Sequence, residues 1–294
     1  MTHAITIRNI QKSFRKKRVL KGINGKIERG KVVGLLGRNG EGKTTLLRIM
    51  LDILAADSGE ISILGMSPDG TGKVRQHVGY VPERPAFHEF MKVSDVFKLR
   101  AEFFPKWDWT KASEMTRKLE LDVKTSIKGA SKGTLAKTAW ICATAHNPGV
   151  LLLDEPTSGL DAVAREAVIS NLVRELSIEG KTILVTNHHM EELLGVLDEV
   201  WIIAGGRIAG RYSIQELRQN TFQVTGRMKQ QTLPQDLLLF DQQRIGDLVR
   251  WVVMDKETLF KLRQQDLLEQ IEIEPLPVEN AFKILLQRTE EPPC

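Results

Sequence analysis

The stretch that decides the fold is Gly37-Arg38-Asn39-Gly40-Glu41-Gly42-Lys43-Thr44-Thr45. It matches the pattern G-x-x-x-x-G-K-[ST], which is typical of loops whose backbone N–H groups wrap a di- or triphosphate. Residues 31–37 are predicted to form a short buried strand before this loop, and residues 44–51 the helix after it. The context therefore favours a phosphate site over a glycine-rich turn that fits the pattern by chance.

Each part of the loop has a predicted role. The helix that begins at its end offers unpaired N–H groups to an anion. Lys43 is expected to reach the β and γ phosphate oxygens, and the hydroxyl of Thr44 is expected to ligate Mg²⁺. Glu41 would repel a phosphate, so its side chain is expected to point away. Glycines keep Cβ atoms clear of the phosphate, and the predicted nucleotide-binding residues of the loop are Gly37, Asn39, Gly40, Gly42, Lys43, Thr44 and Thr45.

A second signal is the aliphatic run 150–153, which is followed by Asp154 and Glu155. A strand of aliphatic residues alone is typical of the centre of a parallel sheet covered on both faces. Ligands bind at the carboxyl ends of such strands. Because neighbouring residues on a strand point to opposite faces, one carboxylate can hold Mg²⁺ while the other addresses a water beyond the γ-phosphate. An ordinary strand with an acidic end is the alternative.

Three more candidates rest on position. Phe14 lies in the basic stretch 12–18, expected to be a loop, and the spacing fits a solvated turn and a ring that stacks on a nucleotide base equally well. His188 and His189 follow the predicted strand 181–186 at the sheet edge that carries Asp154, which favours a γ-phosphate contact. A metal site is not favoured, because no third ligand of suitable spacing accompanies them.

The organisation of the chain is that of an α/β protein with two additions. Strands and helices alternate up to a hairpin at 199–210, which predicts a three-layer α/β core. Amphipathic helices over 86–128 interrupt this alternation as an insert. From about residue 216 the pattern weakens into a small α+β lobe, with strands expected at 222–228, 248–254 and 270–274 and helices at 256–268 and 278–288.

Composition limits the class of protein. The chain has 294 residues and a formal net charge of +5, and residues 221–294 hold nine Lys and Arg against twelve Asp and Glu. The excess of positive charge therefore lies in the first 220 residues, where a nucleotide-binding body explains it without nucleic acid. Two cysteines, Cys142 and Cys294, imply no disulfide framework and fit a reducing cytosol. No signal peptide or membrane span is expected, so a partner would have to supply any membrane part.

In this order the motifs resemble the ATP-binding cassette (ABC) family over residues 4–216. By this resemblance, Phe14 takes the place of the adenine-stacking aromatic, and Glu83 stands where the family usually has the glutamine of its Q-loop. Residues 130–134 correspond to the signature motif, in which Ser131 and Gly133 would contact the γ-phosphate of a second cassette's nucleotide.

The remaining family motifs also find a counterpart. Glu155 matches the catalytic glutamate that follows the Mg²⁺ aspartate, here Asp154, and residues 158–161 match the D-loop with Asp161. His188 matches the switch histidine, and it is chosen over His189 because residues 190–192 then fall at the usual offset.

Departures from the family pattern narrow the resemblance. The signature Ser-Lys-Gly, the glutamate at 83 and the tail over 272–282 are similar to cassettes of ABC-2 type exporters. Glu83 can still accept Mg²⁺-bound water, so it is predicted as a metal-site residue together with Thr44 and Asp154. Its negative charge predicts somewhat weaker binding of Mg·ATP.

The resemblance implies a P-loop NTPase fold of the ABC type. Residues 1–216 would be the ATP-binding domain with a helical subdomain at about 86–147, and residues 217–294 an accessory lobe. The chain would be the ATPase subunit of a membrane transporter, with ATP and Mg²⁺ as cofactors and Lys43, Glu155 and His188 as catalytic residues.

Its implied partners are a membrane permease and a second, identical or different, ABC cassette, at the cytoplasmic face of the membrane; no nucleic acid partner is expected. Two alternatives stay open. One is a soluble ABC ATPase acting on ribosomes or nucleic acid, although such proteins typically carry two cassettes or long coiled coils. The other is a slow nucleotide switch, suggested by Glu83 and Thr134.

Aromatic residues gather in the insert. They either form its own core or leave a groove beside Glu83 for a cytoplasmic helix of the permease. The residues concerned are Phe87, Phe90, Phe97, Phe103, Phe104, Trp107 and Trp109.

Overall fold

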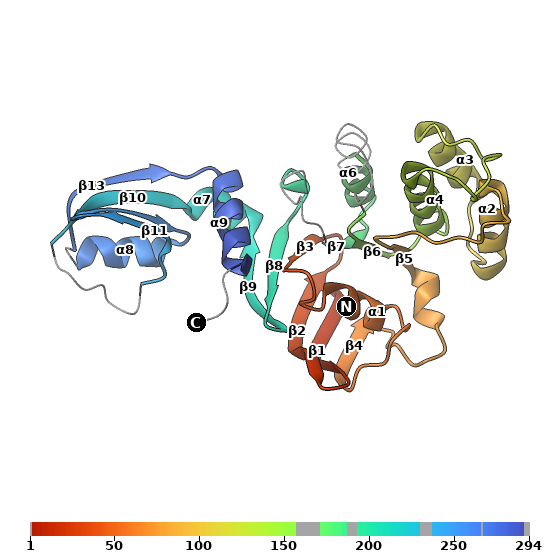
Figure 1. Ribbon diagram of the computed structural model, residues 1–294, viewed down its shortest axis with the longest axis horizontal. Helices are drawn as coiled ribbons and strands as arrows, with labels where there is room; N and C mark the ends of the chain where they lie inside the picture. The colour runs from red at the N-terminus through yellow and green to blue at the C-terminus, as the bar shows by residue number, and fades with distance from the viewer. Residues whose placement is uncertain (1, 157–170, 187–192, 230–236, 266, 291–294) are drawn as a thin grey trace. The chain divides into compact units, whose positions relative to one another are not determined.

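The aliphatic runs of the sequence form a central sheet of six strands in the order β5-β6-β7-β3-β8-β9 (Figure 1). The pairings from β5 through to β8 are parallel. Every residue of β3, β6 and β7 is buried, as expected for strands that are covered on both faces. The six strands are β3 (Val32–Leu36), β5 (Val78–Val81), β6 (Val150–Asp154), β7 (Thr182–Thr186), β8 (Glu199–Ala204) and β9 (Arg207–Ser213).

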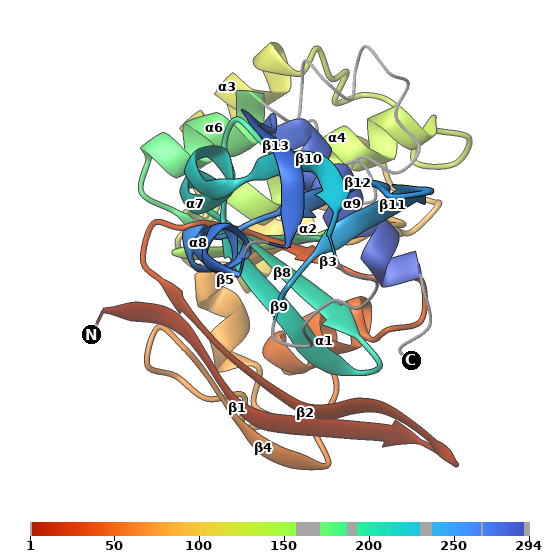
Figure 2. The ribbon, with the colours of Figure 1, turned by 90° about the vertical axis from the view of Figure 1, so that its left-hand side faces the viewer.

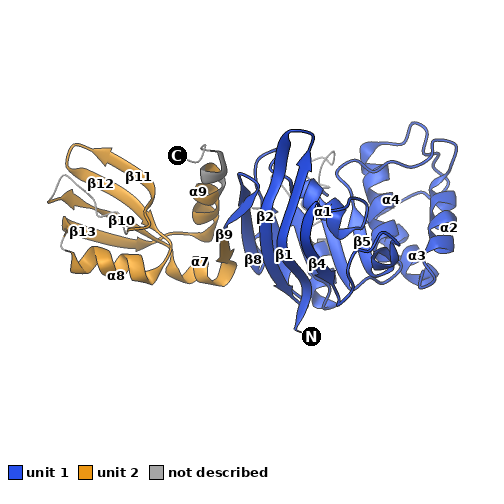
Figure 3. Ribbon diagram, turned by 90° about the horizontal axis from the view of Figure 1, so that it is seen from below, with its two compact units in different colours: residues 1–210 blue, residues 211–294 orange. Residues whose placement is uncertain are grey.

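The computed structural model describes residues 2–156, 171–186, 193–229, 237–265 and 267–290. These divide into two compact units, residues 1–210 and 211–294 (Figure 3). The division falls within β9, a few residues before the boundary at 216 expected from the sequence. None of the helices in these described ranges combines the length and apolar character that a bilayer span requires.

A second sheet in the first unit is antiparallel, and its strands come from the chain before and after the phosphate loop. It contains β1 (His3–Phe14), β2 (Lys17–Glu28) and β4 (Ser58–Ile63) in the order β2-β1-β4 (Figure 2). The expectation of a basic loop over 12–18 is wrong, because β1 and β2 pair as far as Phe14 and Lys17. The turn is reduced to Arg15 and Lys16, with Arg15 at φ 52°. Phe14 therefore lies at the tip of a hairpin.

Helix α1 (Lys43–Met50) packs into the hydrophobic core that the two sheets share. Its buried residues Leu46, Leu47 and Met50 belong to one hydrophobic cluster with residues of β1, β2, β3 and β8. Burying a leucine or methionine side chain contributes roughly 1.5–3 kcal/mol. The helix that begins at the phosphate loop is thus held by the main core of the unit. Beyond it lie the short 3₁₀ helix η1 (Lys73–His77) and, later in the chain, α6 (Asn171–Ile178).

The insert forms three helices, α2 (Val93–Phe103), α3 (Trp109–Lys118) and α4 (Lys132–Thr144), which gather at one end of the first unit in Figures 1 and 3. Ser131 is the N-cap of α4, and its hydroxyl accepts a hydrogen bond from Thr134 N at 3.0 Å. This cap satisfies one of the N–H groups that a helix start leaves unpaired.

The second unit is a four-stranded antiparallel sheet with helices, in agreement with an α+β lobe. The strand order is β11-β12-β10-β13, and Val224, Trp251 and Leu262 share its core. Strand β11 was not predicted, because its sequence Phe-Asp-Gln-Gln-Arg-Ile shows one buried residue followed by five exposed ones. The elements are α7 (Ile214–Asn220), β10 (Phe222–Met228), β11 (Phe240–Ile245), β12 (Leu248–Val253), α8 (Lys256–Gln264), β13 (Leu268–Pro275) and α9 (Val278–Glu290).

Candidate functional site

The phosphate loop closes on its own lysine. The Lys43 ammonium donates to the carbonyl oxygens of Gly37, at 2.6 Å, and Arg38, at 3.3 Å. Gly42 is the N-cap residue of α1 at φ 102°, and a Cβ there would lie 2.5 Å from Leu20 Cδ2. Both the left-handed backbone and the close approach of β2 therefore require glycine at this position. The loop is preformed around the group expected to bind phosphate.

Glu41 is directed out of this loop, as expected. Its carboxylate accepts a hydrogen bond from Gly206 N at 3.2 Å, in the turn between β8 and β9. Glu41 is also absent from the residues that line the cavity described next. Its negative charge is thus tied to a neighbouring backbone N–H instead of facing the loop's interior.

A cavity of about 380 Å³ opens in front of the loop and collects residues from four distant stretches of chain. The hairpin tip contributes Phe14, the segment after β5 contributes Glu83, and the end of β6 contributes Glu155. The loop and the start of α1 supply most of the remaining wall. The lining residues are Phe14, Lys17, Val19, Arg38, Asn39, Gly40, Gly42, Lys43, Thr44, Thr45, Glu83 and Glu155.

The two carboxylates after the aliphatic run face different surroundings. Asp154 is 2% exposed, and its Oδ1 accepts a hydrogen bond from the Thr186 hydroxyl at 2.9 Å. Glu155 is partly exposed and lines the cavity. The alternation expected of neighbouring strand residues does not apply here, because β6 ends at Asp154 and the chain turns at Glu155, with φ 47°. That turn separates a buried, fixed carboxylate from one that reaches the cavity.

Charge in the cavity centres on one buried cation. Burial lowers the pKa of Lys43 from its ordinary value, and the nearby carboxylates of Glu155, Asp154, Glu41 and Glu83 act in the opposite direction, Glu155 most strongly. The acids thus offset part of the effect of burial on the pKa of Lys43. A bound polyphosphate would place negative charge beside this lysine, and a divalent cation would place positive charge beside the carboxylates.

The donor set fits Mg²⁺. The candidates Thr44, Glu83 and Asp154 offer one hydroxyl and two carboxylates, the oxygen ligands that this cation prefers. Among the described residues no group of three or more His, Cys, Asp or Glu could hold a metal ion without help. Mg²⁺ is usually held through one or two protein carboxylates together with substrate phosphate oxygens.

Phe14 is held at the hairpin tip by polar contacts around it. Asp57 accepts hydrogen bonds from Lys12 Nζ at 2.8 Å and from Ser13 N at 2.6 Å. The Lys12 ammonium lies 5.7 Å from the centre of the Phe14 ring, which is 46% exposed and lines the cavity. The ring thus shares one cavity with the phosphate loop, and its stacking on a nucleotide base stays a prediction.

Other predicted residues do not meet at this cavity. Ser131 and Gly133 belong to the start of α4 and are not among the residues that line it. His188 and Asp161 lie outside the described residues. Sequence analysis had not assigned a role to four residues at the site: Lys17, Val19, Arg38 and Thr186. Lys17 lies in the basic stretch that had drawn attention, whereas a valine or threonine in a strand gave no signal.

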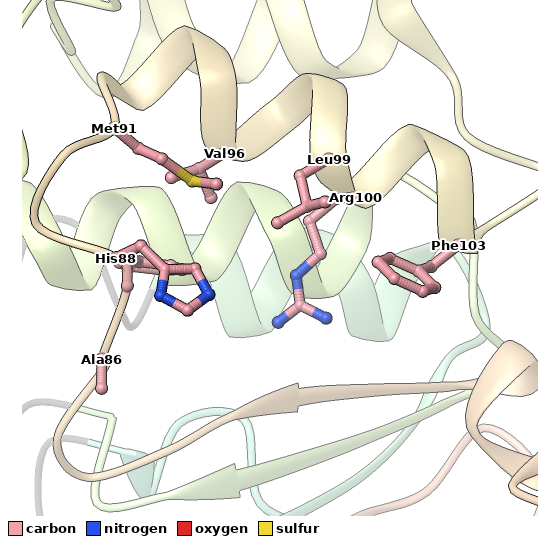
Figure 4. Close-up of a pocket in the computed structure, with 8 residues that line it drawn as sticks. Ala86, His88, Met91, Val96, Leu99, Arg100 and Phe103 are labelled. Carbon is pink, nitrogen blue, oxygen red and sulfur yellow. The ribbon is translucent and has the colours of Figure 1, made fainter.

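A groove of about 310 Å³ lies beside the insert, between α2 and the segment that precedes it (Figure 4). Figure 4 shows the guanidinium of Arg100 between His88 and Phe103, and that guanidinium lies over the Phe104 ring at 5.8 Å. Phe103 is 67% exposed, whereas Phe97 is buried, so the insert's aromatics divide between its core and its surface. The groove is lined by Ala86, Phe87, His88, Met91, Val96, Leu99, Arg100 and Phe103.

Comparison with known proteins places these features in one group. Residues 20–158 match the family model described as ABC transporter. The chain is 30% identical to the ABC transporter ATP-binding protein YtrB of Bacillus subtilis, over 75% of each chain. It is 34% identical to the Nod factor export ATP-binding protein I of Burkholderia lata, over 69% of this chain and 68% of that one. A dimeric ATP-binding cassette solved with ADP and phosphate has the same fold, with a TM-score of 0.65 and 21% identity over 71% of this chain and 98% of that one.

Proposed function

The chain belongs to the family of ABC transporter ATP-binding proteins and is an ATPase of that family, and we propose that it drives an exporter of the ABC-2 type. The observation that carries this proposal is the cavity that joins Phe14, the phosphate loop, Glu83 and Glu155. A base-stacking ring, a phosphate cradle and a carboxylate beyond the γ-phosphate are what ATP binding and hydrolysis need in one place. The export role is supported by the Nod factor relative and by the signature Ser-Lys-Gly.

The phosphate loop supplies binding and charge neutralisation. The Lys43 ammonium exchanges the carbonyls of Gly37 and Arg38 for β and γ phosphate oxygens, and the N–H groups at the start of α1 face the same anion. Thr44, Asp154 and Glu83 would hold Mg²⁺, whose charge offsets that of the phosphoryl group. Because these groups are in place before the reaction, they stabilise developing charge without reorganising.

Glu155 is the proposed general base. Its carboxylate lies at the cavity wall, where it orients and deprotonates a water for attack on the γ-phosphorus. Such a base contributes about 10²–10⁴-fold to the rate. His188 is proposed to hold that water and the γ-phosphate in register, and Asp161 to join the nucleotide contacts; both lie outside the described residues.

The start of α4 is proposed to serve a second cassette. Ser131 and Gly133 lie at a capped helix N-terminus, which favours an anion presented from outside. In a head-to-tail pair, each ATP would lie between one chain's phosphate loop and the other chain's signature. Nucleotide binding then stabilises the closed pair by its own binding free energy.

The pairing is tested with Glu155→Gln, which keeps the shape of the side chain and removes its basicity. We expect this variant to bind ATP and to accumulate as a dimer on size exclusion with light scattering, whereas wild type returns to monomer as it hydrolyses ATP. Glu114→Gln, on α3 and away from the cavity, is the control and should behave as wild type. A Glu155→Gln variant with wild-type turnover would remove Glu155 from the proposed role.

The groove of Figure 4 is the proposed seat of the permease. Its walls are apolar, and among the described residues no carboxylate forms an ion pair with Arg100. The occupant that fits is a short cytoplasmic helix of the permease, with apolar side chains toward Phe87 and Phe103 and an acidic one toward Arg100. Location at the cytoplasmic face of the membrane follows from this attachment.

The two other functions considered for this sequence make different demands. A soluble ATPase acting on ribosomes or nucleic acid gains no support from the relatives, which are named as an ABC transporter ATP-binding protein and a Nod factor export ATP-binding protein. A slow nucleotide switch differs from a motor in rate alone. Steady-state turnover of the purified chain with its permease in liposomes separates the two, because a motor accelerates when substrate is supplied.

A further inference from the structure

Thr186, at the end of β7, contacts both Asp154 and Glu155. Strands β6 and β7 are in register so that Thr186 lies beside Asp154. The Thr186 hydroxyl donates to Asp154 Oδ1 at 2.9 Å and accepts a hydrogen bond from Glu155 N at 3.0 Å. Glu155 N also lies 2.9 Å from the carbonyl oxygen of Thr186. One side chain thus uses its donor on one residue and its acceptor on the next.

The backbone at this point needs such support. Glu155 has φ 47°, in the left-handed region that residues other than glycine rarely adopt. A conformation of this kind is strained and persists only where its surroundings fix it. The turn at Glu155 is what sends its carboxylate into the cavity while Asp154 stays buried. Thr186 holds both sides of that turn.

Asp154 is oriented at both of its oxygens. Thr186 contacts Oδ1, and the Tyr80 hydroxyl, on the neighbouring strand β5, lies 3.5 Å from Oδ2. Thr186 is fully buried. Because a buried carboxylate oxygen is destabilised when it loses its hydrogen-bond donor, the Asp154 carboxylate would rotate to find another partner if the Thr186 hydroxyl were removed.

We propose that Thr186 is a positioning residue that aims Asp154 at the nucleotide-bound cation and Glu155 at the attacking water. The inference rests on the proposed function, because it assigns Thr186 a task in the site described there. Thr186 lies on a different strand from Asp154 and Glu155, so the geometry of hydrolysis depends on the register of β6 and β7.

The test compares Thr186→Val, which has the same shape without the hydroxyl, with Thr186→Ser, which restores it. Thr182→Val is the matched control, since Thr182 is a buried threonine of the same strand whose hydroxyl accepts from Gly30 N at 2.9 Å. Thr182 pairs with Val150, at the opposite end of β6 from Asp154. Thermal unfolding is measured for all variants, and Thr186→Ala is used if Thr186→Val does not fold.

The readouts are the affinity for a fluorescent ATP analogue, titrated with Mg²⁺ or in EDTA, and the steady-state kcat and KM. For Thr186→Val we expect the half-saturating Mg²⁺ concentration to rise about tenfold or more. Binding in EDTA should stay unchanged, and kcat should fall while KM changes little. Thr186→Ser and Thr182→Val should stay within about threefold of wild type in every readout.

Wild-type dependence on Mg²⁺ in Thr186→Val would overturn the inference, and so would equal losses in Thr186→Val and Thr182→Val, which would indicate a general effect of removing a strand hydroxyl. A wild-type chain that binds no nucleotide would instead overturn the proposed function itself. That result is recognised before any variant is compared.

Discussion

The nucleotide cavity takes its walls from loops at strand ends, whereas the groove of Figure 4 takes its walls from α2 and the segment before it. The cavity gathers charged and backbone groups around Lys43, and the groove gathers apolar side chains around Arg100. Binding a polyphosphate requires particular donors at fixed spacing, so a short sequence motif encodes most of the nucleotide cavity. A helical partner demands shape and a few contacts, so the second surface is distributed over residues 86–103.

If this comparison is correct, a substitution in the nucleotide cavity should leave the groove functional, and a substitution in the groove should leave ATP binding unchanged. Lys43→Ala breaks the cavity and is expected to have the largest effect. Loss of a buried, charge-assisted contact to phosphate should weaken ATP binding about 100-fold or more, measured by isothermal titration with Mg·ATP. Lys137→Ala on α4 serves as the control. Full ATPase activity in Lys43→Ala would contradict the assignment of the phosphate loop.

Phe103→Asp alters the groove and leaves the nucleotide cavity unchanged. Introducing a carboxylate and removing a largely exposed ring should weaken capture of the permease by about 10–100-fold, measured by pull-down of co-expressed membrane subunit. ATP affinity should stay at the wild-type level. Phe260→Asp on α8 is the matched control, because Phe260 is 60% exposed and belongs to the second unit. Retained capture by Phe103→Asp would count against the groove.

His146 offers a further test, which concerns the stability of the helical region that carries the groove. Its ring packs at a tilt against that of Phe104, with the centroids 4.1 Å apart, and is 2% exposed. Within the described part of the chain, neither ring nitrogen has a hydrogen-bond partner. Burial lowers its pKa to about 4 from 6.5. The unfolded chain therefore binds a proton that the folded chain excludes, and stability falls as the pH drops from about 6.5 to about 4.

The expected loss is at most roughly 3 kcal/mol over this interval. His146→Leu should flatten that part of the stability curve, followed by urea unfolding at pH 4.5, 5.5 and 7. His77→Leu, at a histidine that lines the same small cavity of about 80 Å³, is the comparison variant. An unchanged pH dependence in His146→Leu would show that another group is responsible.

The core and the phosphate loop could be predicted because local sequence determines them. The aliphatic run 150–153 can only be a central strand, and the glycines with Lys43 specify a loop before a helix. The hairpin at 12–18 was missed in part because basic residues on exposed strand faces look like a loop. Strand β11 was missed because pairing with β12, and not an alternating pattern, keeps it extended.

Three strand residues that the structure, and not the sequence, brings to the site share one property. Tyr80, Thr186 and Val19 act through neighbours that lie far away in the chain, and their own types are ordinary for strands. Which strand lies beside β6, and in which register, is a property of the whole sheet. A motif search sees Asp154 and Glu155 but not the hydroxyl that orients them.

The bond between Glu41 and Gly206 has a consequence for the rest of the chain. Gly206 N donates to Glu41, and Gly206 O accepts a hydrogen bond from Lys21 N at 2.8 Å. The next residue begins β9, whose last residues already belong to the second unit. The single residue Gly206 therefore anchors the phosphate loop at Glu41 and strand β2 at Lys21 to the turn between β8 and β9.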